Sequence, residues 1–310
     1  MRAEKLVEEL IEDRQSGAAR LTIKAASLFL KLLETRPKMS MVSKLAKLIA
    51  EARPSMPSVA NMAYMILRLV EEETSAGVDL EKAIESAVRS AVKDYQRRLK
   101  EVIRNGARLL LGYRSVLTHS YSSTVAAILE SCEGLKVFVT ESRPGLEGLR
   151  FAERLAASKV DVTLIVDSAA SYVLETGEVD LVLIGCDAIL DDCSIVNKIG
   201  SKAIALAASE TEIPFNVVTD LWKAAIHGFS YEEHPPEEVY DGEVEGIKVL
   251  NPYFERVPRD LISRFITEEG SLKPLELRDK LSDLWSYLSG KPLKPLRKPP
   301  QRRFIRGGIS

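Results

Sequence analysis

The chain has 310 residues, of which 45% are hydrophobic and 28% charged, and its net charge is −2. This composition is ordinary for a folded globular protein, and domains of about 150 residues predict one large domain or two smaller ones. The balanced charge gives no reason to expect a nucleic-acid or membrane protein, and no apolar run approaches the roughly 20 residues of a membrane span. Because residues 1–9 are charged throughout, they do not resemble a secretory signal.

The few cysteines and histidines bear on compartment and metal binding. The cysteines are Cys132, Cys186 and Cys193, and the histidines are His119, His227 and His234. A sparse, odd set of cysteines suits a reducing compartment, so we expect a cytoplasmic protein. A zinc site needs four clustered ligands, or three and a water, and these residues are scattered along the sequence. We therefore expect no metal and no cofactor.

The first part of the chain, residues 1–105, is predicted to be a helical N-terminal domain. Apolar residues recur there at intervals of three and four, as on one face of a helix. The predicted helices are Glu4–Asp13, Leu21–Leu33, Met41–Ala52, Val59–Glu72 and Leu80–Ile103, with breaks at Pro37, Pro54, Pro57 and Gly77. An antiparallel bundle buries such apolar stripes, so we expect a helical bundle.

Residues 106–290 are predicted to form a Rossmann-like α/β domain. Short runs rich in β-branched residues lie at Ser115–Thr118, Lys136–Thr140, Val160–Val166, Val179–Ile184, Phe215–Val218 and Ile247–Leu250. Helical stretches lie between them at Ser122–Cys132, Leu146–Ala157, Ser168–Leu174 and Ile195–Ala208. Several strands are apolar without alternation, as expected when helices cover both faces. The fold class is therefore α/β, with a doubly wound parallel sheet.

The last 20 residues, 291–310, form a third segment, a basic proline-rich tail. It contains four prolines and seven lysines or arginines, with no acidic residue. Such a segment is typical of a flexible, solubilising terminus. Seven cations in a short stretch would also suit contact with RNA through release of counterions. Both interpretations stay open at the level of the sequence.

Polar residues follow the ends of several predicted strands. In an open parallel sheet, ligands bind in the crevice beyond the carboxyl ends of the strands. Ser120 and Ser122–Thr124 follow the first strand, Arg143 the second, Asp187 the fourth and Lys223 the fifth. The sequence thus predicts hydroxyls, a carboxylate and cations at the edge where this topology builds a site.

Some of these residues have plainer interpretations. Ser122 and Ser123 suit the N-cap of a helix, and His119 suits a hydrogen-bonded core position. Asp187 is harder to explain in this way, because it emerges directly from the apolar run at 182–185. A carboxylate at such a position needs a partner or a raised pKa, and both features mark functional sites.

Other candidates lie further along the chain and in the helical half. Asn197 and Lys198 offer hydrogen-bond donors ten residues after Asp187. The small pair Gly17-Ala18 would let the backbone approach a phosphate closely. The planar guanidinium of Arg53 suits bidentate contact with a phosphate, although a surface arginine is the plainer interpretation.

Taken together, these segments resemble one family. It contains the alpha, beta and delta subunits of translation initiation factor 2B, ribose-1,5-bisphosphate isomerase and methylthioribose-1-phosphate isomerase. The matching stretches are Asp13-Arg14, Ser16-Gly17-Ala18, Arg53-Pro54-Ser55, Leu117-Thr118-His119, Thr140-Glu141-Ser142-Arg143-Pro144, Glu147-Gly148, Gly185-Cys186-Asp187-Ala188, Asn197-Lys198-Ile199-Gly200, Asn251-Pro252 and Phe254. They run in family order over roughly residues 10–275, and the opening looks most like the archaeal members.

The resemblance implies a fold, an assembly and a chemistry. The fold is a helical N-terminal domain joined to a Rossmann-like domain, with pairing through the latter and hexamers in some members. The family's isomerases convert a 1-phosphorylated aldose to a ketose with a cysteine and an aspartate. The aspartate corresponds to Asp187, but the cysteine position is Ser120 here. A thiol ionises near pKa 8.5, whereas a serine hydroxyl needs an adjacent base.

Two neighbours offer themselves as substitutes for the missing thiol. His119 is adjacent to Ser120, and Cys186 is adjacent to Asp187. Adjacent residues on a strand point to opposite faces, so this alternation argues against both.

The family's ligand contacts are better kept. As implied by the resemblance, and by the helix start for the hydroxyls, the ligand-binding residues are Ser16, Gly17, Ala18, Arg53, Ser122, Ser123, Thr124, Arg143, Asn197, Lys198 and Lys223. Glu147 stands where methylthioribose-1-phosphate isomerases use glutamine, which argues against that substrate.

Three functional interpretations follow. The first, motivated by Ser120, is a non-catalytic protein resembling initiation factor 2B. It would bind a sugar phosphate or an AMP-like nucleotide, form dimers or hexamers, and regulate translation initiation through the alpha subunit of initiation factor 2. The alternative is a ribose-1,5-bisphosphate isomerase of AMP salvage, in which Asp187 is the general acid and Ser120 only orients substrate. The third is a phosphate-ligand protein with an unrelated role, kept open by the basic tail.

Overall fold

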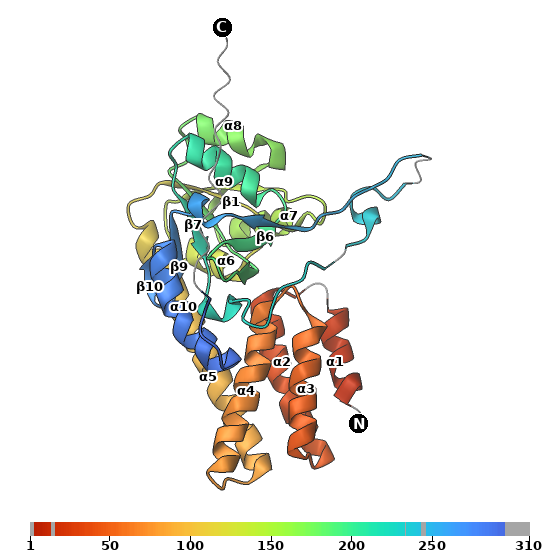
Figure 1. Cartoon of the computed structure of the whole chain (residues 1–310). Helices are drawn as coiled ribbons and strands as arrows, with labels where there is room; N and C mark the ends of the chain where they lie inside the picture. The colour runs from red at the N-terminus through yellow and green to blue at the C-terminus, as the bar shows by residue number, and fades with distance from the viewer. Residues whose placement is uncertain (1–2, 14–15, 233, 243–245, 295–310) are drawn as a thin grey trace.

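The computed structural model describes residues 3–13, 16–232, 234–242 and 246–294 (Figure 1). Arg14, which belongs to the family-like opening, and residues 295–310 of the basic tail lie outside the described residues. Helical and sheet-containing halves are stacked along the molecule, with the helical half at the lower end of Figure 1.

The helical half consists of five helices packed side by side (Figure 1). They are α1 (Ala3–Glu12), α2 (Ala18–Leu32), α3 (Met39–Ala52), α4 (Pro57–Ser75) and α5 (Leu80–Leu110). Their apolar stripes meet in one core, in which Leu10, Phe29, Leu45 and Ile66 are fully buried. The bundle predicted from helical periodicity is confirmed, with ends that differ by a few residues.

Helix α5 belongs to both halves of the molecule. Its first part places Ala87 and Tyr95 in the core of the bundle, and its last part places Val102 and Leu110 against the sheet. Gly106 allows this second contact, since a Cβ there would lie 2.3 Å from Cδ1 of Ile128. The boundary predicted between residues 105 and 106 therefore falls inside a continuous helix.

The second half is built on a mostly parallel sheet. Its strands, among the described residues, are β1 (Ser115–Thr118), β2 (Lys136–Thr140), β3 (Asp161–Ile165), β4 (Leu181–Ile184), β7 (Phe215–Val218), β9 (Arg264–Thr267) and β10 (Gly270–Leu272). Their order is β10-β9-β7-β4-β1-β2-β3, and every pair is parallel except β9 with β10. The chain runs outward in opposite directions from β1 and β4, which makes their junction the switch point of the sheet.

Helices cover both faces of this sheet, which explains its apolar strands. On one face Val116, Val137 and Leu183 pack with α6 (Ser123–Glu130), α7 (Glu147–Ala157) and the end of α5. On the other face Leu117 and Phe215 pack with α8 (Ala170–Glu175), α9 (Ser201–Glu210) and α10 (Pro274–Ser289). The predicted α/β class and doubly covered parallel sheet are confirmed.

Two predicted elements differ from the structure. The helix expected from Ile195 begins only at Ser201, because Ile195–Lys198 is strand β6 of a second sheet. There β6 pairs antiparallel with β5 (Ala188–Ile189) and β8 (Phe254–Val257). The strand expected at Ile247–Leu250 is wrong, since no strand forms there and Leu250 is 81% exposed. The sixth parallel strand is β9 instead, which lies further along the chain.

Short 3-10 turns complete the described chain. They are η1 (Leu33–Thr35), η2 (Asp167–Ala169), η3 (Leu221–Lys223), η4 (Pro236–Glu238) and η5 (Arg259–Leu261). Within the described ranges, none of the helices combines the length and the apolar character needed to cross a membrane.

Candidate functional site

A cavity of about 650 Å³ lies at the carboxyl ends of the central strands, where the helical half meets the sheet. All of the predicted site residues except Arg143 line it: Ser16, Gly17, Ala18, Arg53, Ser120, Ser122, Ser123, Thr124, Asp187, Asn197, Lys198 and Lys223. Residues as far apart in the sequence as Ser16 and Lys223 are thus brought together. The cavity sits at the switch point between β1 and β4, as the rule for open parallel sheets predicts.

The ends of β1 and β4 bring Ser120 and Asp187 to the same edge. After β1, the chain passes through Ser120 and enters α6 at Ser122, whose hydroxyl accepts a hydrogen bond from the Val125 amide at 3.3 Å. Gly185 after β4 lies against this turn, because a Cβ there would lie 2.9 Å from the Ser122 hydroxyl. Ser122 therefore caps α6, as its position in the sequence suggests, and it also lines the cavity.

Asp187 presents to the cavity a carboxyl group that is a weaker acid than an ordinary aspartate. Its backbone amide donates to the Val196 carbonyl at 2.9 Å, and its side chain is only partly exposed. Burial raises the pKa of Asp187 from its ordinary 3.8 to about 6, an effect that Lys223 opposes and Glu147 reinforces. A carboxyl group with this pKa exchanges a proton readily near neutral pH, as a general acid or base must.

A buried ion pair lies beside Asp187. The ammonium of Lys198 is 2.7 Å from Oε1 of Glu147 and 3.3 Å from the centre of the Tyr253 ring. Both charged residues are buried. Burial lowers the pKa of Lys198, while the neighbouring carboxylate of Glu147 opposes that shift. Lys198 thus adds a cation to the cavity wall, and the carboxylate of Glu147 already balances the charge of this cation.

Ser120 faces this pair and not His119. Its hydroxyl donates to Oε1 of Glu147 at 3.3 Å, and its amide donates to the Ser142 hydroxyl at 2.9 Å. Ser120 adopts a φ of 65°, which turns it out of the line of β1. The neighbouring group that could withdraw its proton is therefore the carboxylate of Glu147, a contact that strand alternation did not predict.

His119 and Cys186 are engaged elsewhere. Nε2 of His119 lies 2.8 Å from the Ile199 carbonyl, so it donates there, and Nδ1 at 2.6 Å accepts from the Thr140 hydroxyl. Burial lowers the pKa of His119, which keeps the ring neutral. The Cys186 thiol donates to the Thr219 hydroxyl at 3.2 Å, and burial raises its pKa to about 11. Neither side chain is placed to replace a reactive thiol at Ser120.

The helical half contributes Arg53 and the loop before α2. Nη1 of Arg53 donates to the Asp13 carbonyl at 2.7 Å, and Nε lies 3.3 Å from Oε1 of Glu232. The Ser55 hydroxyl donates to the same Glu232 oxygen at 2.5 Å. Arg53 is therefore a buried, oriented cation, and the surface interpretation of this residue does not hold.

The carboxylate of Asp13 fixes the loop that carries Gly17 and Ala18. It accepts hydrogen bonds from the amide and the hydroxyl of Ser16, both at 2.9 Å, and it pairs with Lys24 at 3.2 Å. Burial disfavours its charge, but these bonds outweigh that effect and lower the pKa of Asp13 to about 2. Ser16 thus holds the loop through Asp13 as well as lining the cavity.

Arg143 lies outside the cavity. Its amide donates to the Asp167 carboxylate at 2.7 Å, and its guanidinium donates to the Val239 carbonyl at 2.6 Å. Several lining residues carry no signal in the sequence, among them Glu232, His234 and Tyr253. These three belong to the long connection between β7 and β8, which has no periodicity, and tertiary contacts hold them: Glu232 binds Arg53 and Ser55, and His234 stacks on Tyr253 with ring centroids 3.6 Å apart.

The cavity thus combines cations, hydroxyls and carboxylates around a polar space. Across the described residues, no three His, Cys, Asp or Glu side chains gather in a way that would hold a metal ion. Arg53 and Lys223 suit the binding of a phosphate, and Asp187 suits proton transfer. The arrangement offers cations, hydroxyls and a proton-exchanging carboxyl group around one cavity.

Comparison with known proteins agrees with this geometry. The model of the initiation factor 2 subunit family matches residues 14–274. The chain belongs to this family. The matched region contains all the cavity residues named above. It also contains every strand of both sheets, the last of which, β10, ends at Leu272.

Several relatives within the initiation factor 2 subunit family are sugar-phosphate isomerases. The ribose 1,5-bisphosphate isomerase of Methanocaldococcus jannaschii is 32% identical over 272 residues, covering 84% of this chain and 86% of that protein. The 5-deoxyribose 1-phosphate isomerase of Moorella thermoacetica is 30% identical, with 83% and 82% covered. The crystal structure of translation initiation factor eIF-2B from Pyrococcus horikoshii OT3 superposes with a TM-score of 0.71 at 26% identity, over 88% of this chain and 97% of that one. The fold is therefore shared by enzymes and by an initiation factor.

Proposed function

We propose that the protein is an aldose–ketose isomerase of sugar 1-phosphates, with ribose 1,5-bisphosphate as the first substrate to test. The observation that carries the proposal is Asp187, a partly buried carboxyl group with a pKa of about 6 in a cavity that also holds Lys198 and Lys223. The isomerases among the relatives support the same class of reaction. This interpretation takes precedence over a purely regulatory one, because a binding protein gains nothing from a carboxyl group poised near neutral pH.

The reaction needs proton transfers that Asp187 is suited to perform. Opening the sugar ring breaks the bond between C1 and the ring oxygen, and the ring oxygen takes up a proton. The net isomerisation then moves one hydrogen from C2 to C1, and the C2 hydroxyl releases its proton to become a carbonyl group, which balances the proton taken up by the ring oxygen. No oxidant or reductant is consumed. A carboxyl group with a pKa near the working pH can both donate and accept a proton, which is the requirement for these steps.

The remaining residues would bind and orient the substrate. Arg53, with the loop at Ser16–Ala18, is proposed to bind one phosphate, since a guanidinium and backbone amides suit its oxygens. The hydroxyls of Ser122–Thr124 lie at the start of α6 and are proposed to bind polar groups at the other end. Lys223 and Asn197 complete the set. Single substitutions at these positions would measure how much each residue contributes to the binding of substrate.

Ser120 is proposed to orient substrate and not to act as a nucleophile. Its hydroxyl donates to Glu147, whose charge is already balanced by Lys198. Because the Glu147 carboxylate is already engaged with the Lys198 ammonium at 2.7 Å, it is not assigned the role of base toward Ser120. Asp187 therefore carries the proton transfer in this proposal.

The test is a coupled assay with purified protein. The purified protein would be incubated with ribose 1,5-bisphosphate, with and without AMP, and the formation of ribulose 1,5-bisphosphate would be measured. We expect turnover by the parent protein and its loss in Asp187→Asn. Turnover that is equal in the two proteins would contradict the role of Asp187, and no turnover in either would contradict the isomerase proposal.

A second candidate is a regulatory role like that of initiation factor 2B, and Ser120 at the family's cysteine position favours it. In this role the cavity would bind a sugar phosphate or an AMP-like nucleotide, and the alpha subunit of initiation factor 2 would be the partner. Association into dimers or hexamers belongs to either proposal and is measured by light scattering. Ligand binding without turnover, together with capture of purified initiation factor 2 alpha subunit, would favour the regulatory role.

A further inference from the structure

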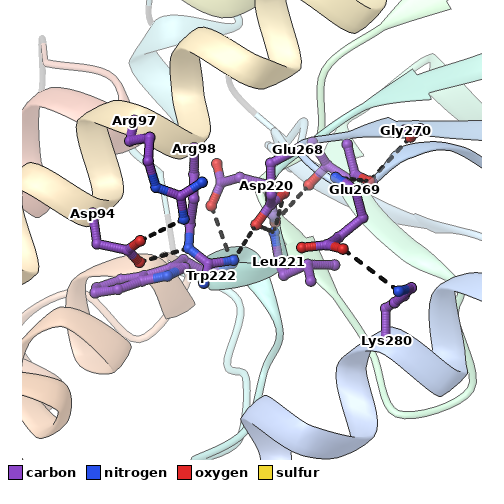
Figure 2. Close-up of polar contacts among 12 residues, drawn as sticks. Asp94, Arg97, Arg98, Asp220, Leu221, Trp222, Glu268, Glu269, Gly270 and Lys280 are labelled. Carbon is purple, nitrogen blue, oxygen red and sulfur yellow. Dashed lines mark hydrogen bonds and ion pairs between the residues drawn. The ribbon is translucent and has the colours of Figure 1, made fainter.

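A cluster of charged side chains, Asp94, Arg98, Asp220 and Glu268, lies between α5 and the end of β9, and of these four Asp220 borders the cavity (Figure 2). Nη1 of Arg98 lies 2.9 Å from Oε1 of Glu268, and Nε of Arg98 lies 2.6 Å from Oδ2 of Asp94. The Glu268 side chain is 2% exposed, so its charge has almost no contact with water. A charge buried to this extent needs a counter-ion and hydrogen bonds, and Arg98 is the counter-ion here.

Glu268 also holds the beginning of the η3 turn. The amide of Leu221 lies 3.3 Å and 3.2 Å from the two carboxylate oxygens of Glu268. The next amide, that of Trp222, donates to Oδ1 of Asp220 at 3.1 Å. The first amides of a helical turn have no partner within the turn, so these two carboxylates satisfy them.

The end of the same turn is held from α4. Nδ2 of Asn61 donates to the carbonyl oxygens of Trp222 at 2.7 Å and Ala224 at 2.8 Å. The ring of Trp222 packs against Tyr95 of α5, with centroids 5.4 Å apart. The η3 turn is therefore fixed at both ends. Asn61 of the helical half holds its end directly, and Arg98 of the same half holds its beginning through Glu268.

The turn delivers Lys223 to the cavity. Its ammonium donates to the Cys186 carbonyl at 2.8 Å and lines the space next to Asp187. We propose that Arg98 and Glu268 are positioning residues, which hold Lys223 at the ligand site by fixing the turn through the Leu221 amide. The inference rests on the proposed function only in taking Lys223 as a ligand contact.

Removing Arg98 has a defined chemical consequence. Burial, reinforced by Asp220 and opposed by the contact with Arg98, raises the pKa of Glu268 to about 7. Without the guanidinium, two buried carboxyl groups would face each other and Glu268 would hold a proton. A neutral carboxyl group accepts a weaker hydrogen bond than a carboxylate, so the Leu221 amide would be held less firmly.

The neighbouring arginine provides a matched control. Arg97 also pairs with Asp94, at 2.7 Å, but its side chain is 60% exposed and makes no bond to Glu268. Arg97→Met and Arg98→Met therefore remove the same charge from adjacent positions of one helix. Glu268→Gln keeps the shape of the acceptor and removes its charge, and Arg98→Lys restores a cation.

The experiment combines hydrogen exchange with ligand binding in the full chain. Exchange of the amides of Leu221 and Trp222 would be followed by mass spectrometry, and binding of inorganic phosphate by calorimetry at constant ionic strength, both well below the melting temperature. In Arg98→Met we expect at least about tenfold faster exchange of these amides and about tenfold weaker phosphate binding. Arg97→Met should change both by less than about twofold, Glu268→Gln should behave like Arg98→Met, and Arg98→Lys should recover part of the loss.

Each outcome decides the inference. Equal exchange in Arg98→Met and Arg97→Met would show that Arg98 does not fix the turn. Faster exchange with unchanged phosphate binding would break the link between the turn and the site. If the parent protein bound phosphate but did not isomerise ribose 1,5-bisphosphate, the proposed function would fail while the inference stood. If the parent did not bind phosphate at all, Lys223 would not be an anion contact and the inference would fall with it.

Discussion

Replacing Asp187 with asparagine is expected to stabilise the fold while it removes activity. The pKa of Asp187 rises from 3.8 to about 6 on folding. One pKa unit corresponds to about 1.4 kcal/mol, so keeping this group ionised in the folded protein costs up to about 3 kcal/mol. Because the side chain is only partly buried, and Lys223 and Lys198 lose a nearby negative charge in the variant, we expect a smaller net gain of about 1–2 kcal/mol at neutral pH.

The sign of the pH dependence follows from the direction of the shift. Below the unfolded pKa of Asp187 both states carry the proton, and the charge costs nothing. As the pH rises through the interval from 3.8 to about 6, the unfolded state releases the proton first, and the parent protein loses stability. Above that interval the loss is constant. The advantage of Asp187→Asn is therefore expected to be small at pH 4, just above the unfolded pKa, and full at pH 7.

The assay is urea unfolding of the parent and Asp187→Asn at several pH values, followed by circular dichroism. Turnover of ribose 1,5-bisphosphate would be measured on the same preparations, with an expected loss of at least about a hundredfold. The control is Asp161→Asn, which makes the same chemical change on the exposed strand β3. Asn197→Asp is unsuitable as a control because it adds a charge to the cavity. A stability difference that does not change between pH 4 and pH 7 would refute the reasoning.

Three further substitutions test other parts of the site. Ser120→Cys is expected to raise turnover by about tenfold or more, because it places a readily ionised thiol where the serine hydroxyl only orients substrate; an unchanged rate in the same assay would show that an ionisable group at this position adds nothing to the proton transfer of Asp187. Arg143→Ala is expected to leave phosphate binding within about twofold of the parent by calorimetry, since its guanidinium is bonded to Val239 outside the cavity; a large loss would return Arg143 to the site. Gly148→Ala is expected to destabilise the fold by more than about 2 kcal/mol in urea unfolding, because its Cβ would lie 1.8 Å from the Thr140 carbonyl oxygen; a neutral effect would mean that the start of α7 shifts freely.

Much of the fold was predictable because its signals are local. The strands at Ser115–Thr118, Lys136–Thr140 and Phe215–Val218 have the predicted bounds, since each is a short apolar run between polar turns. The sequence predicts helix at Ile195–Lys198 because this strand is followed at once by α9, its neighbour β5 is only two residues long, and its other partner, β8, lies far along the chain. The run at 247–250 has strand-like residues, but Ile247 and Leu250 are largely exposed, so no sheet buries its apolar side chains.

The candidate site was predictable to the extent that topology determines it. Ser120 and Asp187 meet because they follow neighbouring parallel strands, and that follows from the order of elements. Arg143 also follows a strand, but Asp167 binds its amide and its side chain points elsewhere. The contact of Glu232 with Arg53 depends on the path of a long aperiodic connection, and no local signal reports it. Position at a strand end predicts nearness to the cavity, whereas the direction of a side chain depends on tertiary contacts.

The continuous helix α5 has a consequence for how the protein unfolds. Because one helix is packed into the bundle through Tyr95 and into the sheet through Val102, neither half can lose its packing without exposing part of the other. The two halves are therefore expected to melt in a single cooperative transition. A fragment ending near residue 105 would cut this helix and leave an apolar ridge in water, so it would be prone to aggregate.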